Sequence, residues 1–335
     1  MAGRIPLFFL ASRVAMVMTL LVLSSACQAQ LSPTFYDKTC PKALTTIRTA
    51  VRAAVDKERN IAASLLRLQF HDCFVQGCDA SVLLDDSDTF KSEKSAPQNS
   101  LAGLEVVDQI KSAVENVCPG VVSCADLLAV VARDASEYVN GPTWTVKLGR
   151  RDSTTASLSL ATSDLPRFDE NFDKVITMFA NKGFNVRELV ALSGAHSIGQ
   201  AACFTFRDWI YSNQNILELS FVSKLRLICP PLTGNNGTFV KFDPVTPDTF
   251  DNGYYKNLMQ KKGLLKTDQL LFSNGGSTAK IVEEYSKDPS KFKSDFAAAI
   301  VKMGDIQPLT GSAGIIRKNC RRVDKSDLIS AKIVI

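Results

Sequence analysis

Nine cysteines occur in this chain, and eight of them follow a segment that we expect to be removed. Residues 1–29 start with two arginines, continue through an apolar run over residues 14–23 and end in small residues. This order is typical of a secretory signal peptide, which we expect to be cleaved between Ala29 and Gln30. An even set of cysteines in an exported chain predicts four disulfides, and so a fold that is fastened covalently.

The pairing of these cysteines is open at this stage, because eight cysteines allow many connectivities. The eight are Cys40, Cys73, Cys78, Cys118, Cys124, Cys203, Cys229 and Cys320. Zinc binding is the competing use, but no two of them show the two-residue spacing that is common in zinc sites.

Charge and hydropathy exclude two classes of partner. The net charge is +5, and loss of the two arginines in residues 1–29 lowers it to +3. A positive charge that is this small and this evenly spread does not indicate binding to nucleic acid. No segment after residue 29 reaches the roughly 18 apolar residues of a membrane span. We therefore predict a soluble exported protein without a transmembrane segment.

The dominant hydrophobic period is helical, which predicts a mostly α-helical fold with minor β segments. Apolar residues recur at three- and four-residue steps over residues 44–55, 61–70, 106–117, 125–138, 172–180, 186–192, 250–258, 279–285 and 291–303. Residues 144–148 are typical of a short strand or an extended segment. Asn236 begins a glycosylation sequon in a stretch rich in Pro, Gly and Asn, which predicts an exposed loop.

The chain holds only two histidines, His71 and His196, and histidine readily moves protons or binds metals near neutral pH. Arg67 lies four residues before His71, so a helix places both on one face with Phe70 beside them. This set suits heterolysis of an O–O bond, because an imidazole can move a proton between the oxygens while a guanidinium stabilises the leaving one. The alternative is a structural histidine beside a solvated arginine.

Hard oxygen ligands follow directly. Asp72, Asp79 and Ser81 lie within ten residues, which is a plausible Ca²⁺ site although the spacing is not that of an EF-hand. His196, in contrast, is flanked by small residues, which we interpret as room for a flat ligand. A neutral imidazole there can ligate haem iron if its other nitrogen has a hydrogen-bond partner, which the residues alone do not identify.

Five motifs together resemble the secretory plant haem peroxidases of class III. They lie at residues 67–74, 77–81, 122–126, 148–152 and 192–199, and the likeness runs from about Gln30 to Arg321. The resemblance implies a peroxidase domain over residues 30–321, whose distal half (about 30–165) and proximal half (about 166–321) sandwich one haem b. It also implies reduction of hydrogen peroxide to water through a ferryl porphyrin-radical intermediate. Two small phenolic donors then each supply one electron.

The resemblance also assigns roles to single residues. His71 is implied as the distal acid–base catalyst, Arg67 as the charge stabiliser and Phe70 as the wall that limits access. His196 is implied as the axial ligand of the haem iron, with Asp268 as its hydrogen-bond partner. Pro166 occupies the position of a proline that contacts the phenol.

Two Ca²⁺ sites and a disulfide pattern are implied in the same way. The distal site would use Asp72, Val75, Gly77, Asp79 and Ser81, supported by Glu93, and the proximal site Ser197, Asp243, Thr246, Thr249 and Asp251. The implied disulfides pair Cys40 with Cys118, Cys73 with Cys78, Cys124 with Cys320 and Cys203 with Cys229.

The chain departs from the family pattern at two places. The family orients its distal histidine with an asparagine supported by a glutamate, which Glu93 matches, but the segment from Glu93 to Gly103 is about two residues shorter than usual. Counting forward from Glu93 reaches Asn99, to which we assign this role, whereas counting back from Gly103 reaches Pro97, whose side chain cannot accept a hydrogen bond. Residues 322–335 outlast the usual end and form either a vacuolar sorting propeptide or a plain terminus. We accordingly expect a secreted monomer, with the vacuole as the alternative destination.

Two other functions are compatible with parts of this pattern. One is a non-catalytic exported protein that keeps the family fold; the joint presence of Arg67, His71, His196 and Asp268 argues against it. The other is a secreted zinc hydrolase that uses both histidines.

Overall fold

The computed structural model describes residues 31–97, 100–212, 216–231 and 235–324. The fold is mostly α-helical, as the periodicity predicted. The α-helices are α2 (Ala43–Lys57), α3 (Ile61–Phe74), α4 (Leu104–Val117), α5 (Cys124–Tyr138), α6 (Leu158–Asp164), α7 (Phe172–Asn181), α8 (Val186–Ser193), α9 (Cys203–Ser212), α10 (Leu219–Ile228), α11 (Gly253–Met259), α12 (Lys266–Ser273), α13 (Gly276–Lys287) and α14 (Pro289–Met303). Short 3₁₀ turns add η1 (Ser81–Leu83), η2 (Glu93–Ser95) and η3 (Gly194–Ser197).

Every predicted helical range lies on a helix, but α6, α9, α10 and α12 were not predicted. α10 shows the physical reason. Its residues Leu219, Leu227 and Ile228 are exposed although they are apolar, so the hydrophobic period along this helix is blurred. α11 begins at Gly253, three residues later than predicted, and the backbone N–H of Phe250 before it donates to the carbonyl of Val139.

The extended segment over residues 144–148 forms no sheet. Leu148 makes one isolated antiparallel bridge with Ser32, through N–H···O contacts of 2.9 and 3.0 Å. The two-stranded sheet lies elsewhere: β1 (Gln200–Ala202) pairs antiparallel with β2 (Phe239–Lys241), with Gln200 opposite Lys241. Strands of three residues are too short to show an alternating pattern, so neither strand could be predicted from the sequence.

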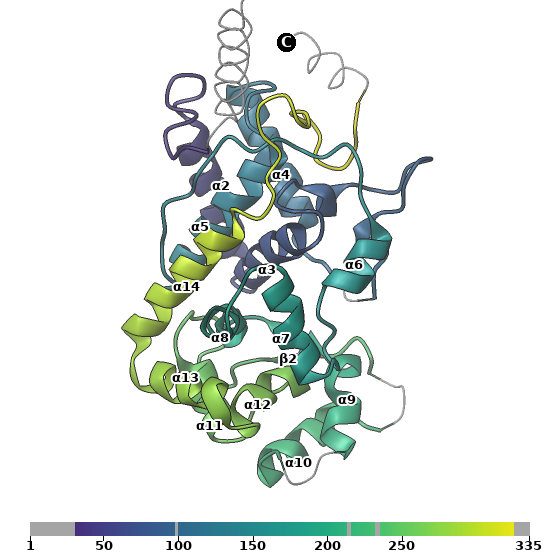
Figure 1. The fold of residues 1–335 in the computed structure, drawn as a ribbon, viewed down its shortest axis with the longest axis vertical. Helices are drawn as coiled ribbons and strands as arrows, with labels where there is room; N and C mark the ends of the chain where they lie inside the picture. Colours follow the sequence, from purple (N-terminus) through teal and green to yellow (C-terminus); the bar gives the residue numbers. More distant parts are fainter. Residues whose placement is uncertain (1–30, 98–99, 213–215, 232–234, 325–335) are drawn as a thin grey trace, which may run out of the picture.

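The helices gather in two halves. Figure 1 shows α2 to α6 in one half and α9 to α13 in the other, with α7 and α8 between them. α14 runs from the second half back toward the first (Figure 1). The segment after α14 then pairs with the first half, because Leu309 and Ile315 form bridges with Arg151 and Asp152. The segment over residues 309–315 therefore lies on the first half, although the proposed division of the domain near residue 165 assigns it to the second.

Four disulfides fasten this arrangement, with the pairing that the family resemblance implied: Cys40–Cys118, Cys73–Cys78, Cys124–Cys320 and Cys203–Cys229. The Cys124–Cys320 bridge closes a loop of 196 residues and ties the C-terminal segment to the start of α5. The Cys203–Cys229 bridge joins the start of α9 to the end of α10.

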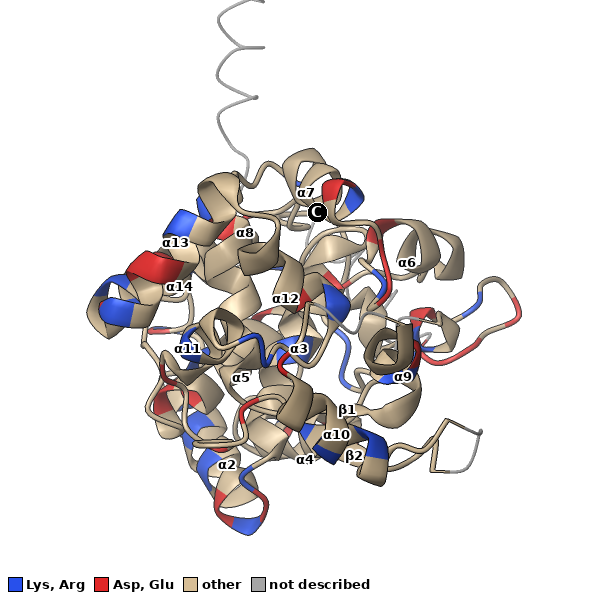
Figure 2. Ribbon diagram, turned by 90° about the horizontal axis from the view of Figure 1, so that it is seen from below, with Lys and Arg blue, Asp and Glu red and all other residues tan. Residues whose placement is uncertain are grey.

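Most buried apolar residues form one core, and a second, smaller core lies around Phe206 and Trp209 of α9. Basic and acidic side chains are interspersed over the helices, as Figure 2 shows for α2, α13 and α14. Within the described ranges, no helix is both long and apolar enough to cross a membrane.

Candidate functional site

One buried face of α3 carries the first set of predicted residues. His71 is buried, and the ring of Phe70 meets it edge-on with 5.6 Å between ring centroids. Phe70 also packs against Phe74, at 4.2 Å between centroids, and so joins a cluster of aromatic rings. Leu65 and Leu68 of the same helix are buried in the main core. This packing anchors α3 and the residues that it carries.

Arg67 projects from the same helix, one turn before His71. Its Nη1 donates to the backbone carbonyl of Ser100 at 3.0 Å and to the Ser100 hydroxyl at 3.3 Å. Burial lowers the pKa of Arg67 to about 10, so the guanidinium keeps its charge at neutral pH. Asn99, the residue assigned to orient His71, lies outside the described residues. Glu93 is buried, and its Oε1 accepts a hydrogen bond from the backbone N–H of Ser157 at 3.2 Å.

The second histidine lies on η3, which continues directly from α8. A capping box fixes the start of α8, since the side chains of Asn185 and Glu188 each accept from the other's backbone N–H. The helix ends at Ser193, and the 3₁₀ turn that follows presents His196. The imidazole is not sealed in protein, because 34% of the side chain is exposed.

Contacts within the protein account for two of the small residues that flank His196. A Cβ on Gly194 would lie 2.3 Å from Tyr255 Oη, and a Cβ on Gly199 would lie 2.8 Å from the Cβ of Ala63. Both glycines are therefore required by contacts within the protein. That the small residues also leave room for a flat ligand stays a prediction. Because Ala63 belongs to α3, the second contact also places the segments that carry the two histidines side by side.

A carboxylate holds the imidazole of His196. Its Nδ1 lies 3.0 Å from Asp268 Oδ1 and 3.1 Å from Oδ2. Asp268 is buried in the first turn of α12. Donation of the Nδ1 proton to this carboxylate leaves Nε2 with the lone pair that a metal requires. The pairing of these two residues, left open by the residues alone and implied by the resemblance, is present.

Two aromatic residues that the sequence analysis missed also contact the pair formed by His196 and Asp268. Phe242 stacks on the His196 ring, with centroids 4.2 Å apart and planes inclined by 14°. Tyr254, at the start of α11, donates its hydroxyl to Asp268 Oδ1 at 2.9 Å. Burial, and then the charge of Asp268, raise the pKa of Tyr254, so the hydroxyl is a donor at neutral pH. Neither residue has a local sequence signal that connects it with His196.

Buried oxygen atoms collect beyond the C-terminal end of α3. Asp72 Oδ2 accepts from the N–H of Ala80 at 3.1 Å, and Asp79 Oδ1 accepts from the N–H of Ser81 at 2.9 Å. Burial, and then the neighbouring charge of Asp79, raise the pKa of Asp72. Among the described residues, Asp72 Oδ1 and Ser81 Oγ have no hydrogen-bond partner. Buried oxygens of this kind are suited to a hard cation.

A second oxygen cluster follows β2. The hydroxyl of Thr246 lies 2.9 Å from Asp251 Oδ2, to which it donates, and 3.3 Å from Asp243 Oδ2, so the two carboxylates converge on it. Thr249 donates its N–H to the carbonyl of Thr246 at 3.1 Å. Ser197, the residue after His196, is fully buried, and its Oγ has no partner within the described ranges.

Neither cluster is built from carboxylates alone. In the part of the chain that the structure describes, no group of three or more His, Cys, Asp or Glu side chains is placed to hold a metal ion. Each cluster offers two aspartates, and hydroxyl and carbonyl oxygens must supply the remaining ligands. That mixture of oxygens is the one that Ca²⁺ takes.

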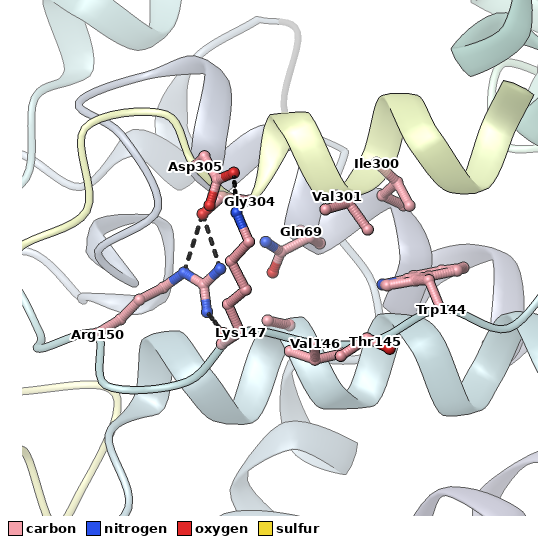
Figure 3. A pocket seen from close by; sticks show the side chains of 11 residues that line it. Gln69, Trp144, Thr145, Val146, Lys147, Arg150, Ile300, Val301, Gly304 and Asp305 are labelled. Atoms are coloured by element: carbon pink, nitrogen blue, oxygen red, sulfur yellow. Dashed lines mark hydrogen bonds and ion pairs between the residues drawn. The ribbon is translucent and has the colours of Figure 1, made fainter. Parts of the chain in front are cut away.

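Two predicted surface residues and one cavity lie apart from the histidines. Pro166 is half-buried between α6 and α7. Asn236 is exposed, and its Oδ1 accepts from Arg207 Nη1 at 2.5 Å. A cavity of about 20 Å³ lies beside Gln69, Trp144 and Arg150 (Figure 3) and has room for about one water molecule. These residues do not include the two histidines, so this cavity is no candidate for the reactive site.

Comparison with known proteins gives consistent matches. Residues 47–288 match the model of the family described as peroxidase. The chain is 57% identical to "Peroxidase 5" of Arabidopsis thaliana, over 93% of this chain and 98% of that protein. It is 59% identical to the "Lignin-forming anionic peroxidase" of Nicotiana sylvestris, over 92% of this chain and 97% of the relative. A "Basic peroxidase" of Zinnia elegans is 53% identical over 94% and 95% of the two chains.

Proposed function

Because this chain belongs to the class III plant haem peroxidases, we propose that its two histidines divide the reaction of hydrogen peroxide with a reducing donor between them. His196 would hold the haem iron, and His71 would move the peroxide proton on the opposite side. The observation that carries this proposal is the contact of His196 Nδ1 with the Asp268 carboxylate at 3.0 and 3.1 Å. This contact leaves Nε2 of His196 available as the iron ligand. His71 needs no comparable carboxylate, because it is not proposed to bind the iron.

The residues around His196 fit a haem group. Its ring is held by Asp268 and by the face of Phe242, and a third of its side chain is exposed. When bound, haem supplies the redox chemistry: it takes up both oxidising equivalents of hydrogen peroxide and returns them one electron at a time. A carboxylate partner makes the imidazole a stronger electron donor, which favours high oxidation states of iron.

On the other side, the residues of α3 handle protons and charge. The imidazole of His71 takes the proton from the near oxygen of the peroxide and delivers it to the far oxygen, which leaves as water. The Arg67 guanidinium, cationic at neutral pH, stabilises the charge that develops on the leaving oxygen. The ring of Phe70 beside His71 limits access to this place to small molecules. Asn99 is proposed to orient His71.

The donors that this arrangement suits are small phenols. Each loses one electron and one proton, so two donor molecules are consumed for each peroxide. Pro166, half-buried between α6 and α7, is proposed to contact the phenol ring.

Two Ca²⁺ ions are proposed to support the halves of the site. Asp72, Asp79 and Ser81, with the carbonyls of Val75 and Gly77 and with Glu93 in support, would hold one ion directly after α3. The second ligand set is Ser197, Asp243, Thr246, Thr249 and Asp251. The partnerless oxygens of Asp72, Ser81 and Ser197 support both assignments.

The expected setting is extracellular. We propose that the chain is exported as a monomer with a glycan on Asn236, and that the vacuole is the alternative destination if residues 322–335 act as a sorting propeptide.

Two alanine variants test the division of roles in the purified, glycosylated protein. His71→Ala should keep the Soret band and slow peroxide heterolysis by about 10²–10⁴-fold or more, the usual contribution of a general acid–base catalyst. His196→Ala should lose or strongly alter the Soret band. Haem lost from the first variant and kept by the second would reverse the assignment, and wild-type protein without a Soret band after haem supplementation would refute it.

A further inference from the structure

The carboxylate of Asp268 receives two hydrogen bonds from side chains, not one. His196 Nδ1 lies 3.0 Å from Asp268 Oδ1, and the hydroxyl of Tyr254 lies 2.9 Å from the same oxygen. Tyr254 and Asp268 are both buried, so water does not compete for the hydrogen bond between them. Hydrogen bonds to a buried carboxylate compete for the same negative charge.

We propose that Tyr254 is a positioning residue that weakens the pull of Asp268 on the His196 proton. This inference rests on the proposed role of His196 as the iron ligand. The Tyr254 hydroxyl withdraws part of the charge of Asp268 Oδ1, so the imidazole keeps more of its proton and donates less electron density through Nε2. Tyr254 thereby sets how strongly His196 favours the higher oxidation states of iron.

Other contacts keep Asp268 in place when that hydroxyl is removed. Asp268 lies in the first turn of α12, directly before the buried Gln269. Gln269 itself bonds the backbone of Gly263 at 2.8 Å and of Leu258 at 3.0 Å, which fixes the start of the helix. Phenylalanine at position 254 would keep the ring that closes the site. Loss of the hydroxyl therefore alters the charge distribution in the carboxylate more than its position.

The next residue supplies a matched control. Tyr255 is also buried and also donates its hydroxyl, but to the carbonyl of Val190 at 2.8 Å. Tyr255→Phe and Tyr254→Phe each remove one buried phenol hydrogen bond, and each should destabilise the fold. Only Tyr254→Phe removes a bond to Asp268.

The test compares the haem-loaded wild type, Tyr254→Phe and Tyr255→Phe by resonance Raman spectroscopy and redox titration. Tyr254→Phe should raise the iron–histidine stretching frequency of the ferrous protein. It should also shift the ferric–ferrous equilibrium toward the ferric state by about tenfold, which is the lower end of the effects usual for a change beside a metal ligand. For a one-electron couple, a tenfold shift corresponds to roughly 59 mV. Tyr255→Phe should leave both unchanged. Fluorotyrosine at position 254, a stronger donor that keeps the ring and the hydroxyl, should shift both quantities in the opposite direction.

An unchanged or lower stretching frequency in Tyr254→Phe, or no shift with fluorotyrosine, would overturn the inference. If Tyr254→Phe does not fold, the fluorotyrosine result decides alone. A wild-type spectrum without an iron–histidine band would instead contradict the proposed function itself. The two failures are thus distinguished by the wild-type spectrum.

Discussion

Replacement of Asp126 by asparagine tests how two of the recognised motifs hold the fold. Asp126 ends the motif at residues 122–126, and Arg150 lies in the motif at residues 148–152. Neither belongs to the candidate site, yet both are fully or almost fully buried. Arg150 Nη1 donates to Asp126 Oδ1 at 3.0 Å, which makes the pair a buried ion pair.

The two carboxylate oxygens of Asp126 have separate donors. Oδ1 accepts hydrogen bonds from Nη1 of Arg150 and, at 3.2 Å, from the backbone N–H of Arg150. Oδ2 accepts from the Tyr36 hydroxyl at 2.8 Å and from the N–H of Gly149 at 2.6 Å. An asparagine has only one oxygen, so its NH₂ group must face one of these two pairs of donors. The variant loses at least two hydrogen bonds as well as the charge that balances Arg150.

Removal of one partner from a buried ion pair costs about 3–5 kcal/mol, and we expect Asp126→Asn to lower the free energy of unfolding by that amount. Tyr36→Phe removes a single donor to the same carboxylate and should cost about 1.5–3 kcal/mol. Glu170→Gln, which breaks the exposed pair with Lys174, should cost about 0.5 kcal/mol or less.

Urea unfolding of the secreted protein with its disulfides intact measures these differences, if circular dichroism and tryptophan fluorescence give the same transition. The order of the three variants matters more than any one value. An Asp126→Asn protein that unfolds within about 1 kcal/mol of the wild type would refute the reasoning, since the structural estimate is three times larger.

Two further predictions concern alkali and calcium. Burial raises the pKa of Tyr36 and Tyr285 above the ordinary tyrosine value. As the pH rises, the unfolded chain therefore releases these protons before the folded chain does, and the free energy of unfolding should fall above about pH 10 by roughly 1.4 kcal/mol per pH unit for each tyrosine. Urea titrations at several pH values should find a shallower slope in Tyr36→Phe. Removal of Ca²⁺ by a chelator should lower the melting temperature reversibly, because the carboxylates of Asp72 and Asp79 are then left buried together; a melting temperature that does not respond to chelator or added Ca²⁺ would contradict the proposed sites.

Local patterns in the sequence predicted the features that depend on neighbouring residues, which are the helices and the residues that share a helix face. The spacing of Arg67 and His71 places both on α3, and the periodic helices are present at their predicted ranges. Contacts between distant segments were out of reach of such reasoning. The partner of His196 lies 72 residues away, and the residues alone left it open among the aspartates; only the family resemblance named it. Gly194 and Gly199 show the same limit, because their neighbours come from other segments.

The two-stranded sheet, which was not predicted, places Phe242 beside His196. Gln200 begins β1 four residues after His196, and Phe242 directly follows the last residue of β2. The register pairs Gln200 with Lys241, and the N–H of Phe242 then donates to the carbonyl of Gly199 at 3.2 Å. This register brings Phe242 over the imidazole of His196. A slip of one residue would turn the Phe242 side chain to the other face of the sheet. Three pairs of strand residues therefore fix the stacking partner of His196, although neither strand is long enough to be recognised in the sequence.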